Sequence, residues 1–222
     1  MATEKKLYRA KPFFPEDDKV EILEAWKGIL DSGMFIQGKY VEEFEKLFAE
    51  YCGTKHAIAT NSGATSLEVM LRATGYTNRK ILVPTQTFVA SVSAIVRSDN
   101  TPVIVDVDPT THILTLDLIK DNVDNETLGV MLVHMAGMLP PDYKEIKEYC
   151  DENNLLLFED ASHAIGAHID STRAGNLGTA AAFSLFATKI ITSGEGGIIT
   201  TNDDEIAKQC RILRNHGSIR RQ

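Results

Sequence analysis

Two side chains with complementary chemistry follow two apolar segments, Asp160 after residues 155–158 and Lys189 after residues 184–188. An apolar run that ends in carboxylates predicts a buried strand that delivers an acid to its C-terminal edge. Lys189 lies among small and apolar residues, and a partly buried lysine loses its charge easily and becomes a nucleophile toward carbonyls. Pyridoxal phosphate chemistry needs such a lysine for a Schiff base, and an acid that keeps the pyridine nitrogen protonated. The pair therefore suggests this chemistry, and other residues must supply the remaining contacts.

The elements that position these residues alternate along the chain. Strand-like runs are expected at 56–60, 81–84, 102–106, 130–134 and 155–160, with helices at 62–74, 89–98 and 142–153. Alternation at this spacing predicts an α/β fold: three layers, α/β/α, around a mostly parallel mixed sheet. Two further runs, 181–184 and 198–201, are expected to pair at an edge of that sheet.

Helices are also expected at both ends of the chain. The first covers residues 16–32, with Val20, Leu23, Trp26 and Leu30 on one face and Gly33 as its stop. A second covers about 41–51, with Phe44, Leu47 and Phe48 as its apolar residues. The last runs from about 203 to 214 and is predicted to be capped by Asn202.

Composition narrows the class of protein. The chain has 222 residues, 43% of them apolar, and a net charge of −8, which fits one large folded domain and argues against nucleic acid as a partner. No stretch has the length and apolarity of a membrane span, and residues 1–6 lack the apolar region of a signal peptide. The three cysteines, Cys52, Cys150 and Cys210, have no metal or redox spacing. We therefore expect a soluble, cytoplasmic protein without a metal site.

Candidate ligand-binding residues follow the predicted strands, where open parallel sheets bind their ligands. Small residues at 61–67 open a helix, so the amides of Gly63 and Ala64 and the hydroxyl of Thr65 can bind an anion, although a plain helix cap explains them equally well. Ser184 can donate to the same phosphate. Phe88 can stack on a cofactor ring, although a phenylalanine at such a position is more often part of the core.

Three further readings stay open at this point. Asp160 can equally cap a turn or take part in a metal site, although no second His or Cys stands at a ligand spacing nearby. His163 can bond a phenolic oxygen of a ring, but a lone histidine is more often structural. The glycines of 194–197 lack the ending of a nucleotide P-loop and predict a tight turn before the next strand.

Several segments resemble, in one order, the DegT/DnrJ/EryC1/StrS aminotransferases. They are Asn-Ser-Gly-Ala-Thr at 61–65, Pro-Thr-Gln-Thr-Phe-Val-Ala-Ser at 84–91, Phe-Glu-Asp-Ala-Ser-His-Ala-Ile-Gly-Ala at 158–167, Phe-Ser-Leu-Phe-Ala-Thr-Lys at 183–189 and Gly-Glu-Gly-Gly-Ile-Ile-Thr-Thr-Asn-Asp at 194–203. Residues 35–45 and 213–217 add two weaker matches, so that the resemblance covers nearly all of the chain from residue 12 onward.

The resemblance implies a fold-type I, pyridoxal phosphate-dependent aminotransferase that moves an amino group, usually from glutamate, to a nucleotide-linked keto-sugar in amino sugar and polysaccharide biosynthesis. Lys189, Asp160 and His163 would be its catalytic residues: Lys189 would bind the cofactor covalently, Asp160 would pair with the pyridine nitrogen, and His163 would lie near the ring oxygen, where many relatives have Gln. Cofactor-binding residues implied besides these are Gly63, Ala64, Thr65 and Ser184 at the phosphate, Phe88 on the ring, and Asn215 at the neighbouring subunit's phosphate. Relatives often have Thr where Ala64 stands.

Residues 1–222 would form the cofactor-binding large domain of such an enzyme, with a helical segment at about 1–52 and an α/β core at about 53–222. The smaller C-terminal domain of the family is expected to be absent, which leaves a fragment, a short form or half of a split enzyme with a separate C-terminal chain as alternatives. Such a chain can also bind cofactor or a partner without catalysing. The resemblance further implies a homodimer, because the cofactor sites of this fold lie between subunits.

Two enzyme classes are weaker alternatives. A sugar dehydratase of the same family commonly has His at the lysine position, so Lys189 argues against it. A nicotinamide-binding domain would carry G-x-G-x-x-G after its first strand, which this chain lacks.

Overall fold

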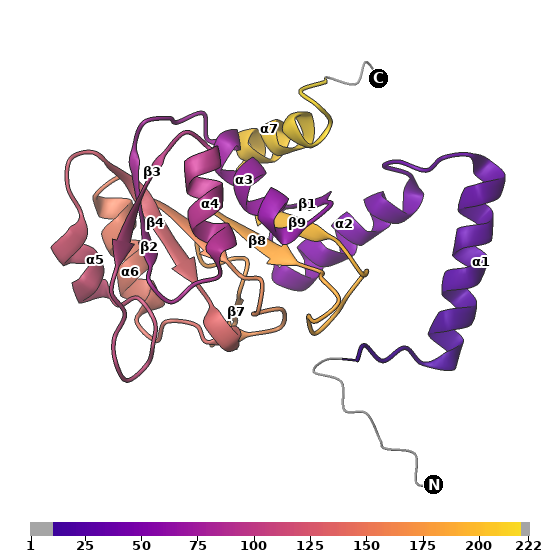
Figure 1. Ribbon diagram of the computed structural model, residues 1–222, viewed down its shortest axis with the longest axis horizontal. Coiled ribbons are helices and arrows are strands. Elements are labelled where there is room, and N and C mark those ends of the chain that lie inside the picture. Colours follow the sequence, from indigo (N-terminus) through magenta and orange to yellow (C-terminus); the bar gives the residue numbers. More distant parts are fainter. Residues whose placement is uncertain (1–10, 219–222) are drawn as a thin grey trace, which may run out of the picture.

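A computed structural model describes residues 11–218 and is built on a seven-stranded mixed sheet. The strands are β1 (His56–Thr60), β2 (Lys80–Pro84), β3 (Thr101–Val105), β4 (Thr127–Val133), β5 (Leu156–Asp160), β8 (Ala180–Ser184) and β9 (Gly197–Thr201). Their order across the sheet is β1-β9-β8-β5-β4-β2-β3, and only β9 runs antiparallel to its neighbours (Figure 1). The predicted mostly parallel α/β fold is confirmed.

Helices cover both faces of this sheet. They are α2 (Lys39–Cys52), α3 (Gly63–Ala73), α4 (Val89–Arg97), α5 (Leu116–Asn122), α6 (Tyr143–Glu152) and α7 (Asp204–Arg214), whereas α1 (Glu16–Ser32) precedes them and lies apart. One core joins α3, α4 and α7 to one face of the strands. On the other face, α5 and α6 pack over one half of the sheet and α2 over the other half. The three-layer arrangement follows from strand alternation, since Ile81 and Val83 enter the first core while Leu82 enters the opposite one.

The strand order corrects one expectation. The runs around 181–184 and 198–201 do pair with each other, as β8 and β9, but neither lies at an edge of the sheet. Strand β8 also pairs with β5, and β9 pairs with β1, so the edges are β1 and β3. The pattern of each segment alone could not reveal this, because β1 and β9 are far apart in the sequence and meet only through the tertiary fold.

The cap of α7 is a second correction. Asp203, not Asn202, caps the helix, because its side chain accepts bonds from the amides of Glu205 and Ile206. Asn202 instead accepts a bond from the amide of Lys55. Three further elements were not predicted: helix α5, the 3-10 turn η1 (Met135–Gly137) and the short hairpin of β6 (His168–Ile169) and β7 (Thr172–Arg173).

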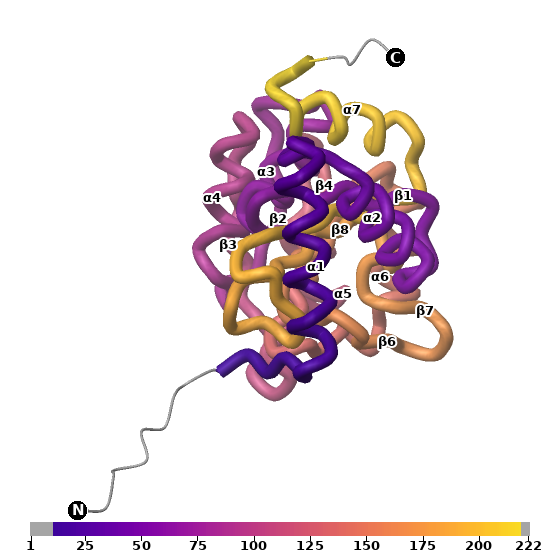
Figure 2. The backbone as a smooth tube through the Cα atoms, turned by 90° about the vertical axis from the view of Figure 1, so that its right-hand side faces the viewer, coloured from indigo at the N-terminus to yellow at the C-terminus, as the bar shows by residue number. Residues whose placement is uncertain are grey.

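Helix α1 forms as predicted but buries nothing. Gly33 ends it in the left-handed conformation at φ 68°, yet none of its residues is buried within the chain. Its apolar face is exposed instead: Val20, Leu23, Trp26 and Leu30. Figure 1 shows α1 standing apart from the sheet, and in the view turned by 90° it lies in front of the rest of the chain (Figure 2). The burial expected from the periodicity is therefore absent within a single described chain.

Helix α2 behaves differently from α1. Phe48 is buried against the sheet and Phe44 packs beside it, whereas Leu47 is exposed, contrary to the predicted apolar face. The expectations for residues 1–6, and the ends of the predicted domain at 1–10 and 219–222, lie outside the described residues. Among the helices of residues 11–218, none has both the length and the apolar character that crossing a membrane requires.

Candidate active site

The predicted site residues gather where β1, β5 and β8 end. Asp160 is the last residue of β5 and Ser184 the last of β8, and these two strands are parallel neighbours. Thr60 ends β1, directly before the turn into α3. Because β9 runs between β1 and β8 with its first residue, Gly197, opposite both Thr60 and Ser184, the sheet sets these chain ends side by side.

Asp160 is a buried acid with two protein donors. Its side chain is only slightly exposed, and Oδ2 accepts a bond of 2.6 Å from the hydroxyl of Ser91 on α4. Oδ1 accepts a bond of 3.2 Å from the amide of Ser162, in the loop that follows the strand. The predicted delivery of an acid to the strand end is therefore what the structure shows.

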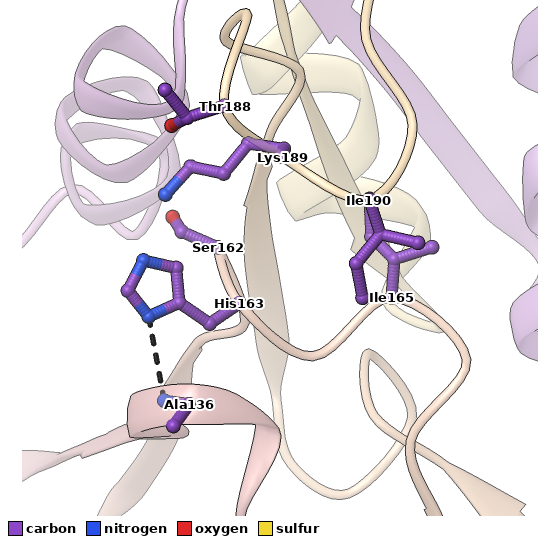
Figure 3. Close-up of a pocket in the computed structure, with 7 residues that line it drawn as sticks. All are labelled: Ala136, Ser162, His163, Ile165, Thr188, Lys189 and Ile190. Carbon is purple, nitrogen blue, oxygen red and sulfur yellow. Dashed lines mark hydrogen bonds between the residues drawn. The ribbon is translucent and has the colours of Figure 1, made fainter. Parts of the chain in front are cut away.

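Lys189 and His163 share one pocket of about 240 Å³. The other residues that line it are Ala136, Ser162, Ile165, Thr188 and Ile190. Figure 3 shows the Lys189 amine and the His163 ring directed into the same space, with the Ser162 hydroxyl between them. The Nδ1 atom of His163 accepts a bond of 3.4 Å from the amide of Ala136 in η1, which leaves the rest of the ring facing the pocket. The structure thus brings the predicted lysine and histidine together.

The electrostatics of this pocket favour a neutral amine. Partial burial lowers the pKa of Lys189 from its ordinary value, although the nearby carboxylate of Asp160 acts in the opposite sense. Burial and the Lys189 charge also lower the pKa of His163, against the effect of Asp160. Both groups are partly exposed, so solvent weakens these interactions. A lysine with a lowered pKa presents more of its nucleophilic form near neutral pH.

This lowered pKa predicts unusual reactivity for Lys189. Its neutral amine persists to lower pH, so reductive methylation of Lys189 should reach half of its maximal rate at a lower pH than that of Lys144, whose pKa is raised by the bond to Asp170. Brief labelling between about pH 7 and pH 10, followed by mass spectrometry of the peptides, gives both profiles in one sample. Identical profiles for the two lysines would contradict the expectation.

A second group of predicted residues meets at the N-terminus of α3. Ser62 caps the helix by accepting a bond from the amide of Thr65, which leaves the amides of Gly63 and Ala64 without a partner inside the helix. A side chain at Gly63 would stand 2.8 Å from Cβ of Ser184, and one at Gly197 would overlap the Ser62 carbonyl oxygen. These contacts hold the helix start directly against the end of β8 and the start of β9. Open helix amides, with the hydroxyls of Thr65 and Ser184 beside them, are groups that can bind an anion.

Two predicted residues lie outside both groups. Phe88 is 69% exposed at the start of α4 and does not line the pocket, so the alternative of a core phenylalanine is excluded within the described chain. Asn215 follows the end of α7. Its neighbour Arg214 bonds to Glu45 and to the carbonyl oxygen of Ala59, which fixes the end of α7 to α2 and β1. Neither position tests a role in binding.

The residues that support Asp160 were not predicted. Ser91 lies within 84–91, a segment that resembles the family, but its residue type alone does not indicate a partner. Glu159 is fully buried on the opposite face of β5, where it bonds His134 and the amides of Gly175, Leu177 and Gly178. A charged residue inside an apolar strand was the only available indication, because buried carboxylates require partners. Its partners come from segments that no local pattern connects to it.

Comparisons with known proteins agree with this geometry. The model of the DegT/DnrJ/EryC1/StrS aminotransferase family matches residues 16–222. GDP-perosamine synthase of Caulobacter vibrioides is 44% identical over 181 residues, which cover 81% of this chain and 48% of that protein. The X-ray structure of an aminotransferase from Psychrobacter cryohalolentis superposes with a TM-score of 0.85 at 33% identity, over 93% of this chain and 52% of that one.

One further neighbour contains a cofactor. The structure of E. coli GDP-4-keto-6-deoxy-D-mannose-3-dehydratase with bound hydrated PLP has a TM-score of 0.82 and 27% identity, over 92% of this chain and 52% of that one. The chain spans about half the length of the curated relatives that it matches first, 48% of one and 52% of the next.

The residues at this edge of the sheet fit pyridoxal phosphate. An amine with a lowered pKa can bind its aldehyde, a buried acid lies on a neighbouring strand, and open helix amides beside Ser184 suit its phosphate. Within residues 11–218, no three His, Cys, Asp or Glu side chains are grouped so that they could hold a metal ion.

Proposed function

Because the chain belongs to the DegT/DnrJ/EryC1/StrS aminotransferase family, we propose that it is the pyridoxal phosphate-binding part of an enzyme that transfers an amino group to a nucleotide-linked keto-sugar. The pocket shared by Lys189 and His163, next to the buried Asp160, carries this proposal. We assign this transaminase to amino sugar biosynthesis for polysaccharides; the similarity to a GDP-perosamine synthase supports a nucleotide-linked product.

Each predicted residue has one task in this proposal. Lys189 holds the cofactor covalently, Asp160 faces its ring nitrogen, and His163 lies near its ring oxygen. The phosphate is bound by the start of α3 and by the end of β8, and these residues are Gly63, Ala64, Thr65 and Ser184. Phe88 covers one face of the ring, and Asn215 reaches the phosphate of a second subunit.

The reaction then depends on proton transfer at one nitrogen. When bound, pyridoxal phosphate supplies an electron sink for the substrate carbon that loses its proton. With its Nζ free and neutral, Lys189 would be the group of this pocket that accepts that proton and later gives it back. Its lowered pKa suits this task, since a base works best when its pKa is near the working pH. Asp160, held by Ser91 and by the amide of Ser162, would be the partner of the ring nitrogen.

Two substrates, an amino donor and a keto-sugar acceptor, are proposed by their chemical class. Glutamate is the proposed amino donor and a keto-sugar linked to a nucleoside diphosphate is the proposed acceptor. Supporting names are GDP-perosamine synthase for a relative and a GDP-keto-sugar dehydratase for a structural neighbour. We place the enzyme in the cytoplasm, because all three cysteines, within the described residues, are free and buried, as is typical of reducing compartments.

An absorption spectrum tests the cofactor assignment. The purified chain is mixed with pyridoxal phosphate, scanned in the visible range, reduced with borohydride and digested for mass spectrometry. A visible band that borohydride removes, with the reduced cofactor attached to Lys189, supports the proposal. Attachment spread over the exposed lysines, without a band, would contradict it. Because relatives are about twice as long, a chain that binds cofactor without turnover would favour the second candidate, a cofactor-binding subunit completed by a separate C-terminal chain.

We also propose a homodimer, and α1 supplies the support for it. Four large apolar side chains are exposed along one face of this helix: Val20, Leu23, Trp26 and Leu30. A helix face of this kind is stabilised when a second surface covers it. A second copy of the chain is the proposed cover.

Replacing Trp26 by glutamate should weaken this dimer. A buried tryptophan at an interface often contributes about 2 kcal/mol or more, so the dissociation constant should rise by about thirtyfold or more. Sedimentation velocity over a range of concentrations measures the change. Trp26 is the only tryptophan, so its emission in the unchanged chain should also shift to longer wavelength on dilution. The control is Lys27→Glu, which introduces the same residue type beside the apolar face. Equal dissociation constants for both variants would contradict the proposed interface.

A further inference from the structure

Two hydroxyl groups at the start of α4, those of Ser91 and Thr87, support the carboxylate of Asp160. Ser91, in the first turn of α4, is fully buried, and its hydroxyl donates a bond of 2.6 Å to Oδ2 of Asp160. Its oxygen lies 2.7 Å from the hydroxyl oxygen of Thr87, which precedes the helix. Three oxygen atoms from two segments far apart in sequence therefore form one hydrogen-bonded row that ends on the carboxylate.

The direction of this row follows from counting protons. A carboxylate only accepts, so the single hydroxyl proton of Ser91 is given to Asp160. Ser91 can then only accept from Thr87 across their 2.7 Å contact. The other acceptor open to Thr87, the Phe88 carbonyl oxygen, is farther away at 3.2 Å. Hydrogen bonds that point the same way polarise and strengthen one another, and a charged acceptor strengthens them further.

The row fixes the direction of the carboxylate as well as its position. Oδ1 accepts from the amide of Ser162 in the loop after β5, while Oδ2 accepts from α4. Donors from two separate elements leave the carboxylate little freedom to rotate, and each oxygen still has a lone pair for another donor. Ser162 also lines the pocket that contains Lys189, so one of the donors that orient the carboxylate belongs to the wall of that pocket.

We propose that Ser91 is a positioning residue, which with Thr87 behind it holds the Asp160 carboxylate in the orientation that receives the pyridine nitrogen of the cofactor. Phe88 lies between these two hydroxyl residues in sequence, at the start of α4. The same row therefore ties the residue proposed to cover the ring to the acid proposed to face its nitrogen. This inference rests on the proposed function, because it assigns the support of that site.

A double-mutant cycle tests the inference. Four chains are compared: unchanged, Ser91→Ala, Asp160→Asn, and the chain with both changes. Two quantities are measured for each: affinity for pyridoxal phosphate by titration of its absorbance, and unfolding by urea without cofactor. Ser91→Ala should weaken cofactor affinity about tenfold when Asp160 is present, and about twofold or less in the chain that also carries Asp160→Asn. The urea midpoints should show the same coupling.

Two further variants separate positioning from general damage to α4. Thr87→Val keeps the volume of Thr87 but removes its hydroxyl, and should weaken cofactor affinity about threefold. Ser98→Ala removes another buried hydroxyl at the end of the same helix, where it bonds only backbone and Asn100, and should leave cofactor affinity unchanged.

The outcomes distinguish this inference from the proposed function. Ser91→Ala effects that are equal with and without the Asp160→Asn change, or matched by Ser98→Ala, would overturn the inference while cofactor binding by the unchanged chain still supported the function. An unchanged chain that binds no pyridoxal phosphate would overturn both. A third outcome is that Ser91 and Asp160 are coupled in unfolding but not in cofactor affinity. Ser91 would then only stabilise the fold, and this would also overturn the inference.

Discussion

Lys189→Ala should abolish transamination, with a rate loss of at least about ten-thousandfold, because one amine both binds the cofactor and moves the proton. The substitution affects a partly exposed side chain, so the fold should persist. The borohydride-dependent attachment of cofactor should disappear in the same variant. Single-turnover mixing with glutamate, followed in the visible range, measures the loss directly, since it reports the half-reaction without the need to know the keto-sugar.

The matched control is Lys144→Ala, which removes an exposed lysine bonded to Asp170 on the surface. Its single-turnover rate should equal that of the unchanged chain. A Lys189→Ala variant with more than about one hundredth of the unchanged rate would contradict the role of Lys189, because general acid–base catalysis alone is worth more than that.

Glu159→Ala should have the largest effect on stability. The side chain of Glu159 is fully buried, and its two oxygens accept bonds from three backbone amides and from the ring of His134. Each buried donor that loses its partner costs about 1–3 kcal/mol, so the free energy of unfolding should fall by more than about 4 kcal/mol. That is a large share of the stability of an ordinary domain. Urea unfolding followed by circular dichroism measures the change.

Glu148→Ala is the control for this loss. Glu148 is exposed on α6, and surface substitutions usually change stability by less than about 0.5 kcal/mol. A Glu159 variant that unfolds within about 1 kcal/mol of this control would show that the amides of Gly175, Leu177 and Gly178 find other partners. Since Glu159 and Asp160 are neighbours in β5, the Glu159 variant should also bind cofactor less tightly wherever it still folds.

Much of the fold was predictable because each strand carries its own pattern. The runs of β2 and β5, for example, were recognisable within one residue of their observed bounds, since a buried parallel strand is a continuous apolar segment between turns. The edges of the sheet were not predictable. The place of β9 between β1 and β8 depends on pairing between distant segments, which no local pattern encodes.

The same distinction applies to the site. Asp160, Lys189 and the small residues before α3 were recognisable from residue type and from their place after strands, and the structure brings each to one edge of the sheet. Ser91 was not recognisable as a partner of Asp160. Its role depends on a contact of 2.6 Å between α4 and β5, which only the packing of those elements creates. The apolar face of α1 was predicted, but its exposure was not, because periodicity does not say whether another part of the chain covers a face.

The position of β9 also governs the order in which the molecule can assemble. Strand β1 pairs only with β9 in the sheet, and His56 lies opposite Thr201. The hydrogen bonds between β1 and the sheet can therefore form only after β9 is present. Contacts between segments so distant in sequence close large loops and slow folding. Gly197 also lets the start of α3 lie directly against the sheet, because a side chain there would overlap the Ser62 carbonyl oxygen. During synthesis, β2, β3, β4, β5 and β8 can therefore pair with one another before β9 emerges, and β9 then brings the start of α3, the proposed phosphate site, against β8.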